Sequence, residues 1–472
     1  MKRSSCIITV LCALSSAGCM TTPLVSPVMR PAAAPAELGN VKLTVRWPSS
    51  RLAQAMPFAT NRLTLTVESA AGEAVAQSSL EQGQTTVSME LPTGTGYKLR
   101  VRADAATQAN IAGAEAIFSV LRNRNTDLAV ELSPVIRRFA GSPDAAEASQ
   151  ADRATLLNQP DGIWWEGRDL LVANNYNNTI VRIDPTGNIG VIAGGGNADL
   201  DSEPLATQAL LSNPTSILTD LDGNIWLQTD FTRLCVIPKR DGEMYGRMRQ
   251  AGRVYPILTG NGIDPEVYFI GSSMALDSDG RILLTSGDEG LVYRLSAASA
   301  ATASLTPIIG KGGQPPRPEG TDPLAAYIGS PVGLAVDQDG NIAVASDYPA
   351  QVTVLCKKAG RIFGMDMQAG QSYRLGESAF GEALPKRLAF DRDGHLYFVS
   401  NADHTIRRFD RATGILSRVS GQPGATSQVN PLGNDGPAAA ASFRTPLGIA
   451  ISSDNRLFIS DTENHQIRLI HL

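Results

Sequence analysis

Apolar and polar positions alternate in a pattern that recurs six times between Pro160 and the C-terminus. In the last copy, an apolar run at Pro446–Ala450 is followed by a turn, a run at Leu457–Asp461, a polar corner and a run at Gln466–Ile470. The copies begin 54 to 61 residues apart, at Pro160, Pro214, Gly271, Pro331, Pro385 and Pro446. A period of this length indicates one supersecondary unit repeated in space.

Each repeat is predicted to hold four strands. A turn such as Asp337-Gln338-Asp339-Gly340 joins the first two, because Gly accepts a positive φ and Asp bonds its own backbone. The sixth repeat lacks a fourth strand, and Val135–Gly141, ahead of the first repeat, has the missing pattern. Pairing these ends would remove the open edges. We therefore predict an all-β chain whose residues 135–472 form a six-bladed β-propeller closed by an N-terminal strand.

A different pattern covers residues 39–134. Strict alternation at Val41–Trp47, Leu63–Val67 and Tyr97–Arg102 is typical of strands with one buried face. Further candidates at 74–80, 86–91, 114–120 and 127–132 bring the total to seven short strands, which favours a small immunoglobulin-like β-sandwich, although no cysteine pair marks it. This domain is interpreted as a spacer or stalk, with a second binding surface as the alternative.

The N-terminus has the pattern of an export signal. Lys2 and Arg3 precede a short apolar run, and Ser15-Ser16-Ala17-Gly18-Cys19 follows it. Residues 1–19 resemble a bacterial lipoprotein signal with Cys19 as the lipidated residue, although Ser16 stands where that family usually has Leu. Ordinary cleavage after Ala17, giving a secreted soluble protein, is the alternative. Residues 20–38, rich in Thr, Pro and Ala, would be the tether, and Met20 implies the outer membrane in a Gram-negative host.

Composition limits the partners. Charged residues make up 18% of the chain and the formal net charge is -5, so nothing favours nucleic acid as a partner. Of five cysteines only Cys235 and Cys356 lie in the predicted folded part, in the second and fourth repeats, where we expect free buried thiols.

The repeats resemble those of NHL-repeat propellers. Asp461–Arg468 carries the motif, and Ala402–Arg407 and Asn177–Arg182 are weaker copies. The loop Gly433–Ala438 is similar to a linker of bacterial and teneurin-type NHL domains. Pro238–Gly252 and Cys356–Gly370 align without gaps and look like an insertion found in exported bacterial NHL proteins. The resemblance covers about 340 residues and implies architecture more than activity.

The candidates for chemistry have structural alternatives. His404 and His465 take the corner position that gives the NHL repeat its His, where a hydrogen-bonding role is expected. NHL-type lyases of peptide amidation hold zinc with histidines from several blades, and that set is not assembled here. A His465–Glu463 pair would resemble streptogramin lyases. The Asp-x-Asp-Gly turns resemble the start of an EF-hand loop but lack its late Glu. We predict no catalytic set, no metal and no cofactor.

Polar corners between the second and third strands are the candidate binding face. Aromatic residues among Asn and Asp can bind a peptide or glycan, or simply be solvated. Trp164 stands where four other repeats have Ala, so it either packs or narrows the channel. The candidate face comprises Asn174, Asn175, Tyr176, Asp230, Phe231, Asp288, Asp347, Tyr348, Asn401, Asp403 and Glu463.

The sequence thus predicts a monomeric, lipid-anchored protein of the cell envelope that presents a propeller to a protein or carbohydrate without catalysing a reaction. An exported lyase or lactonase with its site in the propeller channel is the alternative. A structural envelope component is a third interpretation.

Overall fold

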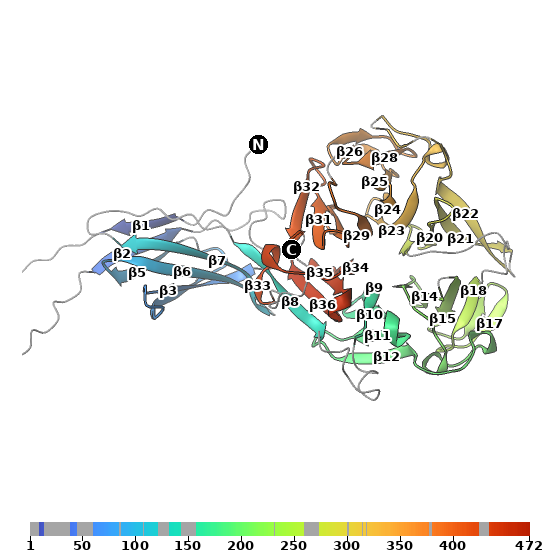
Figure 1. The fold of residues 1–472 in the computed structure, drawn as a ribbon, viewed down its shortest axis with the longest axis horizontal. Coiled ribbons are helices and arrows are strands. Elements are labelled where there is room, and N and C mark those ends of the chain that lie inside the picture. Colours follow the sequence, from blue (N-terminus) through green and yellow to red (C-terminus); the bar gives the residue numbers. More distant parts are fainter. Residues whose placement is uncertain are drawn as a thin grey trace, which may run out of the picture. The chain divides into compact units, whose positions relative to one another are not determined.

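The structure is a computed structural model. It describes residues 9–13, 38–44, 60–120 except 85 and 107, 132–142, 157–258 except 231, 273–299, 302–376 except 314 and 318, 380–423 and 434–472. The chain divides into two compact units, Met1–Val135 with His471–Leu472, and Ile136–Ile470. Both are built from strands (Figure 1), and the helical segments described are single 3₁₀ turns of three residues.

The first unit contains two antiparallel sheets. One has the order β1-β2-β5, from β1 (Thr9–Ala13), β2 (Leu38–Thr44) and β5 (Thr86–Pro92). The other has the order β4-β3-β6-β7, from β3 (Thr60–Glu68), β4 (Ala74–Glu81), β6 (Gly94–Ala105) and β7 (Gln108–Val120). Val41, Leu63, Leu91 and Val101 belong to one shared core, so the alternating residues bury one face of each sheet as predicted.

Three predictions for this N-terminal region remain untested. The immunoglobulin-like assignment stays a prediction, and its strand at 127–132 lies outside the described residues except for Leu132. Cys19 and the tether also lie outside them, apart from Leu38. Strand β1 falls within the predicted export signal and pairs with β2, so cleavage of a signal would remove a partner of β2.

The second unit is a propeller. In its described residues, five separate four-stranded antiparallel sheets form blades, each numbered from its inner to its outer strand. Blade 1 is β9 (Pro160–Glu166), β10 (Asp169–Asn174), β11 (Thr179–Ile183) and β12 (Ile189–Gly194); blade 2 is β13 (Ser216–Thr219), β14 (Ile225–Thr229), β15 (Arg233–Ile237) and β18 (Tyr255–Leu258). Blade 3 is β19 (Met274–Leu276), β20 (Ile282–Ser286), β21 (Leu291–Ser299) and β22 (Thr302–Gly310). Blade 4 is β23 (Ser330–Val336), β24 (Ile342–Tyr348), β25 (Ala350–Leu355) and β28 (Ser372–Leu375); blade 5 is β29 (Pro385–Phe390), β30 (Leu396–Ser400), β31 (Thr405–Phe409) and β32 (Leu416–Ser420).

The last set of strands, blade 6, takes its outer strand from the start of the unit. It consists of β34 (Pro446–Ile451), β35 (Arg456–Asp461), β36 (Gln466–His471) and β8 (Ser133–Gly141). Strand β36 pairs antiparallel with β8, with Ile470 opposite Ile136 and Ile467 opposite Ala140. The inner strands contact one another in the closed cycle β9, β13, β19, β23, β29, β34 and back to β9 (Figure 1). The all-β propeller class and the predicted closing strand are confirmed. Blade 6 is not a separate sheet, because Ser133 and Pro134 of β8 pair with β7.

The Asp-x-Asp-Gly turns join the first two strands of four blades. The Asp337 Oδ1 atom accepts the N–H groups of Asp339 at 2.9 Å and Asn341 at 2.8 Å. Asp220, Asp277 and Asp391 accept the same pair of N–H groups in their turns. Gly340 has a φ of 80°, and in the sixth repeat Asn455 takes the same place with a φ of 61°. These carboxylates therefore hold the turn backbone, as the turn interpretation predicts.

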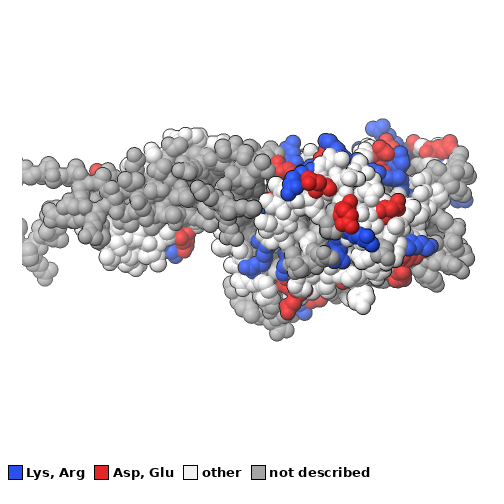
Figure 2. All heavy atoms as spheres, turned by 90° about the horizontal axis from the view of Figure 1, so that it is seen from above, with Lys and Arg blue, Asp and Glu red and all other residues white. Residues whose placement is uncertain are grey.

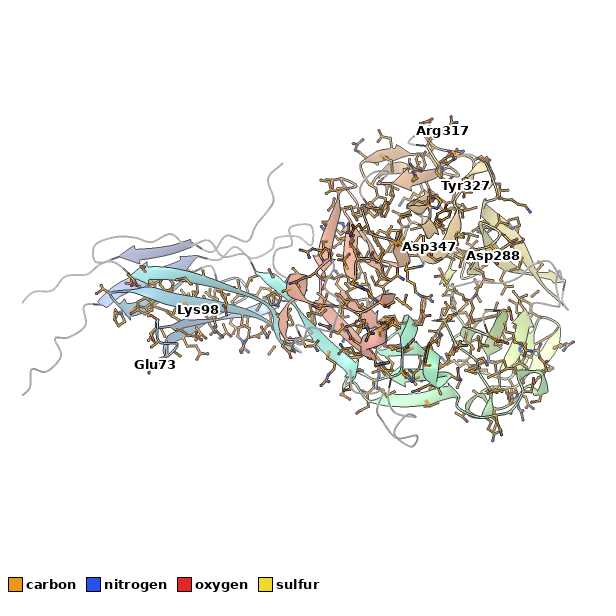
Figure 3. The ribbon with its side chains drawn as sticks, viewed as in Figure 1. Glu73, Lys98, Asp288, Arg317, Tyr327 and Asp347 are labelled. Carbon is orange, nitrogen blue, oxygen red and sulfur yellow. The ribbon has the colours of Figure 1, made fainter. Side chains whose placement is uncertain are left out.

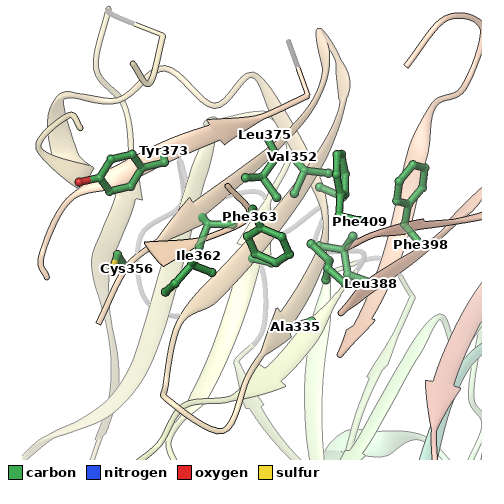
Figure 4. Close-up of a cluster of buried hydrophobic side chains, with 14 of the residues drawn as sticks. Ala335, Val352, Cys356, Ile362, Phe363, Tyr373, Leu375, Leu388, Phe398 and Phe409 are labelled. Carbon is green, nitrogen blue, oxygen red and sulfur yellow. The ribbon is translucent and has the colours of Figure 1, made fainter. Parts of the chain in front are cut away.

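The aligned insertions of blades 2 and 4 are two equivalent hairpins, β16 (Gly242–Met244) with β17 (Arg247–Arg249), and β26 (Gly360–Ile362) with β27 (Met365–Met367). In each, a tyrosine hydroxyl of the fourth strand accepts a backbone N–H, from Gln250 to Tyr255 and from Gln368 to Tyr373. Figure 4 shows Ile362 and Phe363 of the second hairpin packed among Val352 and Leu375 of blade 4 and Phe409 of blade 5. The insertions therefore extend the core between neighbouring blades.

The two cysteines predicted as free thiols are free and buried. Burial raises the pKa of Cys235 to about 12, which makes its thiol unreactive at neutral pH.

The described linkers between blades contain four 3₁₀ turns and one short strand: η4 (Leu200–Ser202), η5 (Ala206–Gln208), η6 (Pro323–Ala325), η7 (Ala438–Ala440) and β33 (Gly436–Pro437).

Candidate functional site

One end of the blades, here called the corner face, gathers the corners between second and third strands and the linkers to the next inner strand. Backbone hydrogen bonds join the two kinds of segment: Asp230 donates to Ser212 at 2.5 Å, and Glu463 donates to Arg444 at 3.1 Å. Because neighbouring strands run in opposite directions, the Asp-x-Asp-Gly turns lie at the other end, here called the turn face.

A repeated hydrogen bond locks three corners to the next blade. In each, a corner side chain accepts the N–H of the residue before the proline that opens the following inner strand. The donor and acceptor residues all have a φ between 45° and 56°. This conformation costs energy for residues other than Gly, and it persists only where surrounding contacts compensate for that cost. The pairs are His465 with Gln159 at 3.1 Å, His404 with Thr445 at 3.1 Å, and Asn178 with Asn213 at 2.9 Å.

The predicted hydrogen-bonding role of the corner histidines is therefore confirmed. The Nδ1 atom of His465 accepts a hydrogen bond from a backbone N–H, so this nitrogen carries no proton and the ring is neutral when the bond is formed. Burial lowers the pKa of His465, and the nearby Arg444 guanidinium lowers it further. Glu463, its suggested catalytic partner, instead forms an ion pair with Arg444 at 2.6 Å.

In four blades the side chain of the last residue of the second strand accepts a backbone N–H from the linker that precedes the blade; these residues are Asn174, Thr229, Ser400 and Asp461. Asp461 accepts the N–H of Arg444 at 2.8 Å and pairs with the equally buried Arg468 at 3.0 Å. Burial raises the pKa of Asp461, and Arg468 opposes that rise. Asn174 is the counterpart in blade 1 and accepts the N–H of Asn158 at 2.7 Å. Asn174, part of the predicted binding face, is thus fully buried and serves the fold.

The other predicted face residues fall into three groups. Asp403 is buried and paired with Arg407. Asn175, Asp347, Asn401 and Glu463 are half-buried, and Asn175 donates to the Pro214 carbonyl at 3.2 Å. Tyr176, Asp230, Asp288 and Tyr348 are exposed, and Phe231 lies outside the described residues.

Exposed aromatic rings mark this corner face. Tyr176 is 62% exposed, and Tyr348 is 80% exposed. Tyr327, in the linker between blades 3 and 4, is 44% exposed and accepts a hydrogen bond at its carbonyl from the Gln351 amide at 3.4 Å. Figure 3 labels Tyr327 together with Asp288 and Asp347, which come from the corners of blades 3 and 4. The face therefore offers aromatic surface beside carboxylates.

At the mouth of the central channel on this corner face, Arg387 reaches across from blade 5. Its Nη2 atom lies 3.0 Å from Oδ1 of Asp161 on blade 1 and 2.5 Å from the carbonyl of Thr215 on blade 2. Its Nη1 atom lies 3.4 Å from the Ser216 hydroxyl. Blades 2 and 5 are opposite each other in the cycle of inner strands, so the guanidinium bridges the channel.

The charges at this mouth are paired. Burial raises the pKa of Asp161, while Arg387 and then Lys386 act in the opposite direction. The Nζ atom of Lys386 lies 2.5 Å from Oδ2 of Asp347. Asp347, a residue of the predicted binding face, therefore lies at the mouth of the channel. Over the propeller surface seen in Figure 2, Lys and Arg side chains are likewise interspersed with Asp and Glu.

Below the mouth lies a cavity of about 260 Å³ that all six inner strands line. Trp164 lines it and also packs against the cores of blades 1, 2 and 3. Both roles considered for Trp164 are therefore present. Among the described residues, no group of three or more His, Cys, Asp or Glu side chains converges in a way that could hold a metal ion.

Sequence reasoning missed Asp161, Lys386 and Arg387. A signal was present: the position of Arg387 is Gly162, Ser216, Ser273, Gly333 or Gly448 in the other repeats. The other repeats have only Gly or Ser at this position. An arginine there indicates that its side chain extends over the channel, where there is room for it. Gly333 shows the constraint, because a Cβ there would lie 2.0 Å from the carbonyl of Lys386.

Comparison with known proteins identifies one repeat. Residues 443–468 match the NHL repeat model. This NHL repeat spans β34, β35 and η8 (Thr462–Asn464) and ends within β36, so it includes the His465 corner. Over 172 residues the chain is 26% identical to Protein SUPPRESSOR OF QUENCHING 1, chloroplastic, of Arabidopsis thaliana. The match covers 32% of this chain and 15% of the plant protein, so the chain spans a small part of that relative.

Several solved structures are similar to this chain over most of its length. A protein of unknown function from Bacteroides thetaiotaomicron has a TM-score of 0.45 at 14% identity, covering 91% of this chain and 93% of that one. A virginiamycin B lyase from Staphylococcus aureus has a TM-score of 0.40 at 14% identity, with 79% and 91% covered. An auxiliary nutrient binding protein from Bacteroides ovatus has a TM-score of 0.42 at 11% identity, with 91% and 93% covered.

Within the described residues, no helix has both the length and the apolar character needed to cross a membrane.

Proposed function

We propose that this chain is a non-catalytic binding protein that presents the corner face of its propeller to a protein or carbohydrate. The supporting observation is the pair of exposed rings, Tyr176 and Tyr348, on the face that also carries the exposed carboxylates of Asp230 and Asp288. Tyrosine supplies a large rigid contact surface with a polar tip and is enriched in binding sites for this reason.

The use made of the other polar groups also favours binding over catalysis. The two corner histidines that resemble catalytic groups accept backbone hydrogen bonds at 3.1 Å. The channel carboxylate of Asp161 is paired with Arg387, and Asp347 is paired with Lys386. A general base needs a lone pair that can reach a proton of the substrate. The histidines and carboxylates named here instead use theirs for hydrogen bonds and ion pairs within the protein.

Anchoring in the cell envelope is the second part of the proposal. Lipid on Cys19 would tether the protein, residues 20–38 would be the linker, and the sandwich at 39–134 would be an immunoglobulin-like spacer. Metabolic labelling with a radioactive fatty acid tests the anchor: label is expected on the wild type and lost in Cys19→Ser. Release of unlabelled protein from wild-type cells would instead support cleavage after Ala17. A monomer without cofactors is proposed for the mature protein.

A specific observation favours the second candidate, an exported lyase or lactonase. Asp161 lies at the channel mouth with a raised pKa, which is how a general acid is prepared. Under that hypothesis Asp161→Asn abolishes turnover of a substrate that still binds.

A glycan array and a peptide array, probed with the purified protein, test the binding proposal. Saturable binding to one ligand is expected, with at least a tenfold loss in Tyr176→Ala/Tyr348→Ala. Met248→Ala is the matched control, because Met248 is 73% exposed but lies in the blade 2 insertion at the turn face. Equal loss in the control, or full binding by the double variant, would refute the assignment to the corner face.

A further inference from the structure

Several segments of the corner face meet at Gly329, in the linker between blades 3 and 4. A Cβ on Gly329 would lie 2.3 Å from the carbonyl oxygen of Tyr348, the last residue of β24. A Cβ on Gly290, in the corner of blade 3, would lie 2.9 Å from the carbonyl oxygen of Gly329. The backbone N–H of Lys311 donates to the Gly290 carbonyl at 3.3 Å. The resulting Gly329 junction comprises residues 288–290, 311, 327–329 and 347–348.

Two exposed tyrosine rings belong to the Gly329 junction. Tyr348 is 80% exposed and Tyr327 is 44% exposed. Both are held through their backbones: the Tyr348 carbonyl lies against Gly329, and the Tyr327 carbonyl accepts the Gln351 side-chain amide at 3.4 Å. A tyrosine combines a flat apolar ring with a polar hydroxyl. Such a ring can pack against the C–H face of a sugar while its hydroxyl bonds to a neighbouring group.

One carboxylate and one ammonium group accompany the rings. Asp288 (Figure 3) and Lys311 are both exposed, and neither side chain has a hydrogen-bond or ion-pair partner among the residues that the structure describes. Glu289 differs, because its carboxylate accepts the Tyr293 hydroxyl at 2.7 Å. The two free charges at the junction are therefore opposite in sign. Together they offer a ligand an acceptor and donors of hydrogen bonds without favouring a strongly charged one.

We propose that the Gly329 junction binds a neutral oligosaccharide, with sugar rings against the two tyrosines and hydroxyls bonded to Asp288 and Lys311. This inference rests on the corner-face function proposed above and selects carbohydrate from its two ligand classes. A sugar hydroxyl both donates and accepts, so it suits a carboxylate that only accepts and an ammonium group that only donates. A protein partner would bury an apolar centre, and among the described residues of the junction the exposed large apolar side chains are Tyr327 and Tyr348.

Neutral and charged oligosaccharides of one length test the ligand class. Cellohexaose, maltohexaose and xylohexaose are the neutral probes, and hexagalacturonate and hexaglucosamine carry charges of opposite sign. Binding to the full chain is measured by isothermal titration calorimetry. Saturable one-to-one binding of at least one neutral probe is expected, with both charged probes at least tenfold weaker. Failure of every neutral probe to bind saturably, or a charged probe that binds as tightly as the best neutral one, would overturn the proposal.

Substitutions at exposed positions locate the site. Tyr327→Ala and Asp288→Asn should each weaken binding of the best neutral probe at least fivefold, because a ring or a hydrogen-bond acceptor is lost. Leu221→Ala and Asp222→Asn are the matched controls, because they change an exposed apolar side chain and an exposed carboxylate at the turn face, and they should leave binding unchanged. Equal loss in the controls, or full binding by both junction variants, would overturn the assignment to the junction.

The failure of this inference can be told apart from failure of the corner-face function. An array ligand that is lost in Tyr176→Ala/Tyr348→Ala but retained by both Tyr327→Ala and Asp288→Asn would leave the corner-face function standing and overturn the junction alone. An array ligand retained by all of these variants would refute both.

Discussion

The Nδ1 atom of His465 accepts a hydrogen bond from the backbone N–H of Gln159 at 3.1 Å. The bond joins blade 6, in which the two ends of the propeller pair, to the linker that leads into blade 1. Asn178 makes the equivalent bond between blades 1 and 2 with an amide oxygen. The junction between blades 6 and 1 thus depends on an acceptor that protonation can block. The junction between blades 1 and 2 depends on an amide oxygen, which is not protonated in this pH range.

This difference predicts that the stability of the junction between blades 6 and 1 depends on pH. Because the pKa of folded His465 lies below the unfolded value of about 6.5, the unfolded chain binds the proton first. The stability associated with a neutral His465 is therefore complete above about pH 6.5 and is lost as pH falls from there towards the folded pKa. His465→Asn should keep the bond at pH 7.5 and reduce the loss of stability between pH 7.5 and 5. Thermal unfolding at both values measures it.

His465→Leu is the companion variant. It removes the acceptor at every pH and should cost about 1 kcal/mol, the typical net contribution of a hydrogen bond, because the N–H of the partly buried Gln159 loses its partner. Some pH dependence should persist in both variants, because burial also lowers the pKa of His395. An Asn variant as pH-sensitive as the wild type would contradict the role given to this imidazole.

The closing strand predicts a sharp requirement at Gly141. Its φ is 82°, and a Cβ there would lie 2.3 Å from the carbonyl of His465. Gly141→Ala should therefore destabilise the propeller by about 2–4 kcal/mol. Gly190→Ala, in the outer strand of blade 1 with nothing within 4 Å of the added methyl, is the control and should be nearly neutral. Similar unfolding midpoints for the two variants would contradict the closure geometry.

The Arg387 bridge predicts strong coupling across the channel. Arg387→Met leaves Asp161 buried without its main partner and should cost about 3 kcal/mol. Arg387→Met/Asp161→Asn should recover part of that loss, which a double-mutant cycle by urea unfolding would show. Arg361→Met is the matched control, because its partner Asp366 is exposed, and a change under about 1 kcal/mol is expected. Additive effects of the two channel substitutions would contradict the coupling.

The turn carboxylates predict indifference to chelators. Asp337 already accepts two backbone N–H groups, so removal of divalent cations should leave the melting temperature unchanged. Asp337→Ala should cost about 2 kcal/mol, whereas Asp222→Ala, at an exposed middle position of another such turn, should cost little. Calorimetry with and without chelator decides the matter, and a fall of several degrees on chelation would favour the calcium interpretation instead.

Much of the fold was predictable because it is local and repeated. The Asp-Gly turns and the pattern of Val135–Gly141 are read from neighbouring residues, and both match a backbone need seen in the structure. The equivalence of the two insertions followed from an alignment of the chain with itself, whereas their hairpin structure was not predicted. Periodicity carries such information directly.

The site was less predictable because it depends on residues from different blades. Arg387 meets Asp161 and Thr215 across the channel, at a sequence separation of 226 and 172 residues. Burial was also hidden: Asn174 and Tyr176 stand two positions apart in one polar corner, yet the first is fully buried and the second is 62% exposed. Composition of a corner does not reveal which side chain turns inward.

The most direct test of binding without catalysis is the mass of the ligand after contact with the protein. A ligand found on the arrays is incubated with excess wild-type protein, released by denaturation and weighed by mass spectrometry, beside the Asp161→Asn variant. Recovery of the unaltered mass in both samples is the result predicted for a binding protein. A changed mass with wild type that Asp161→Asn prevents would contradict it and establish an enzyme of the propeller channel.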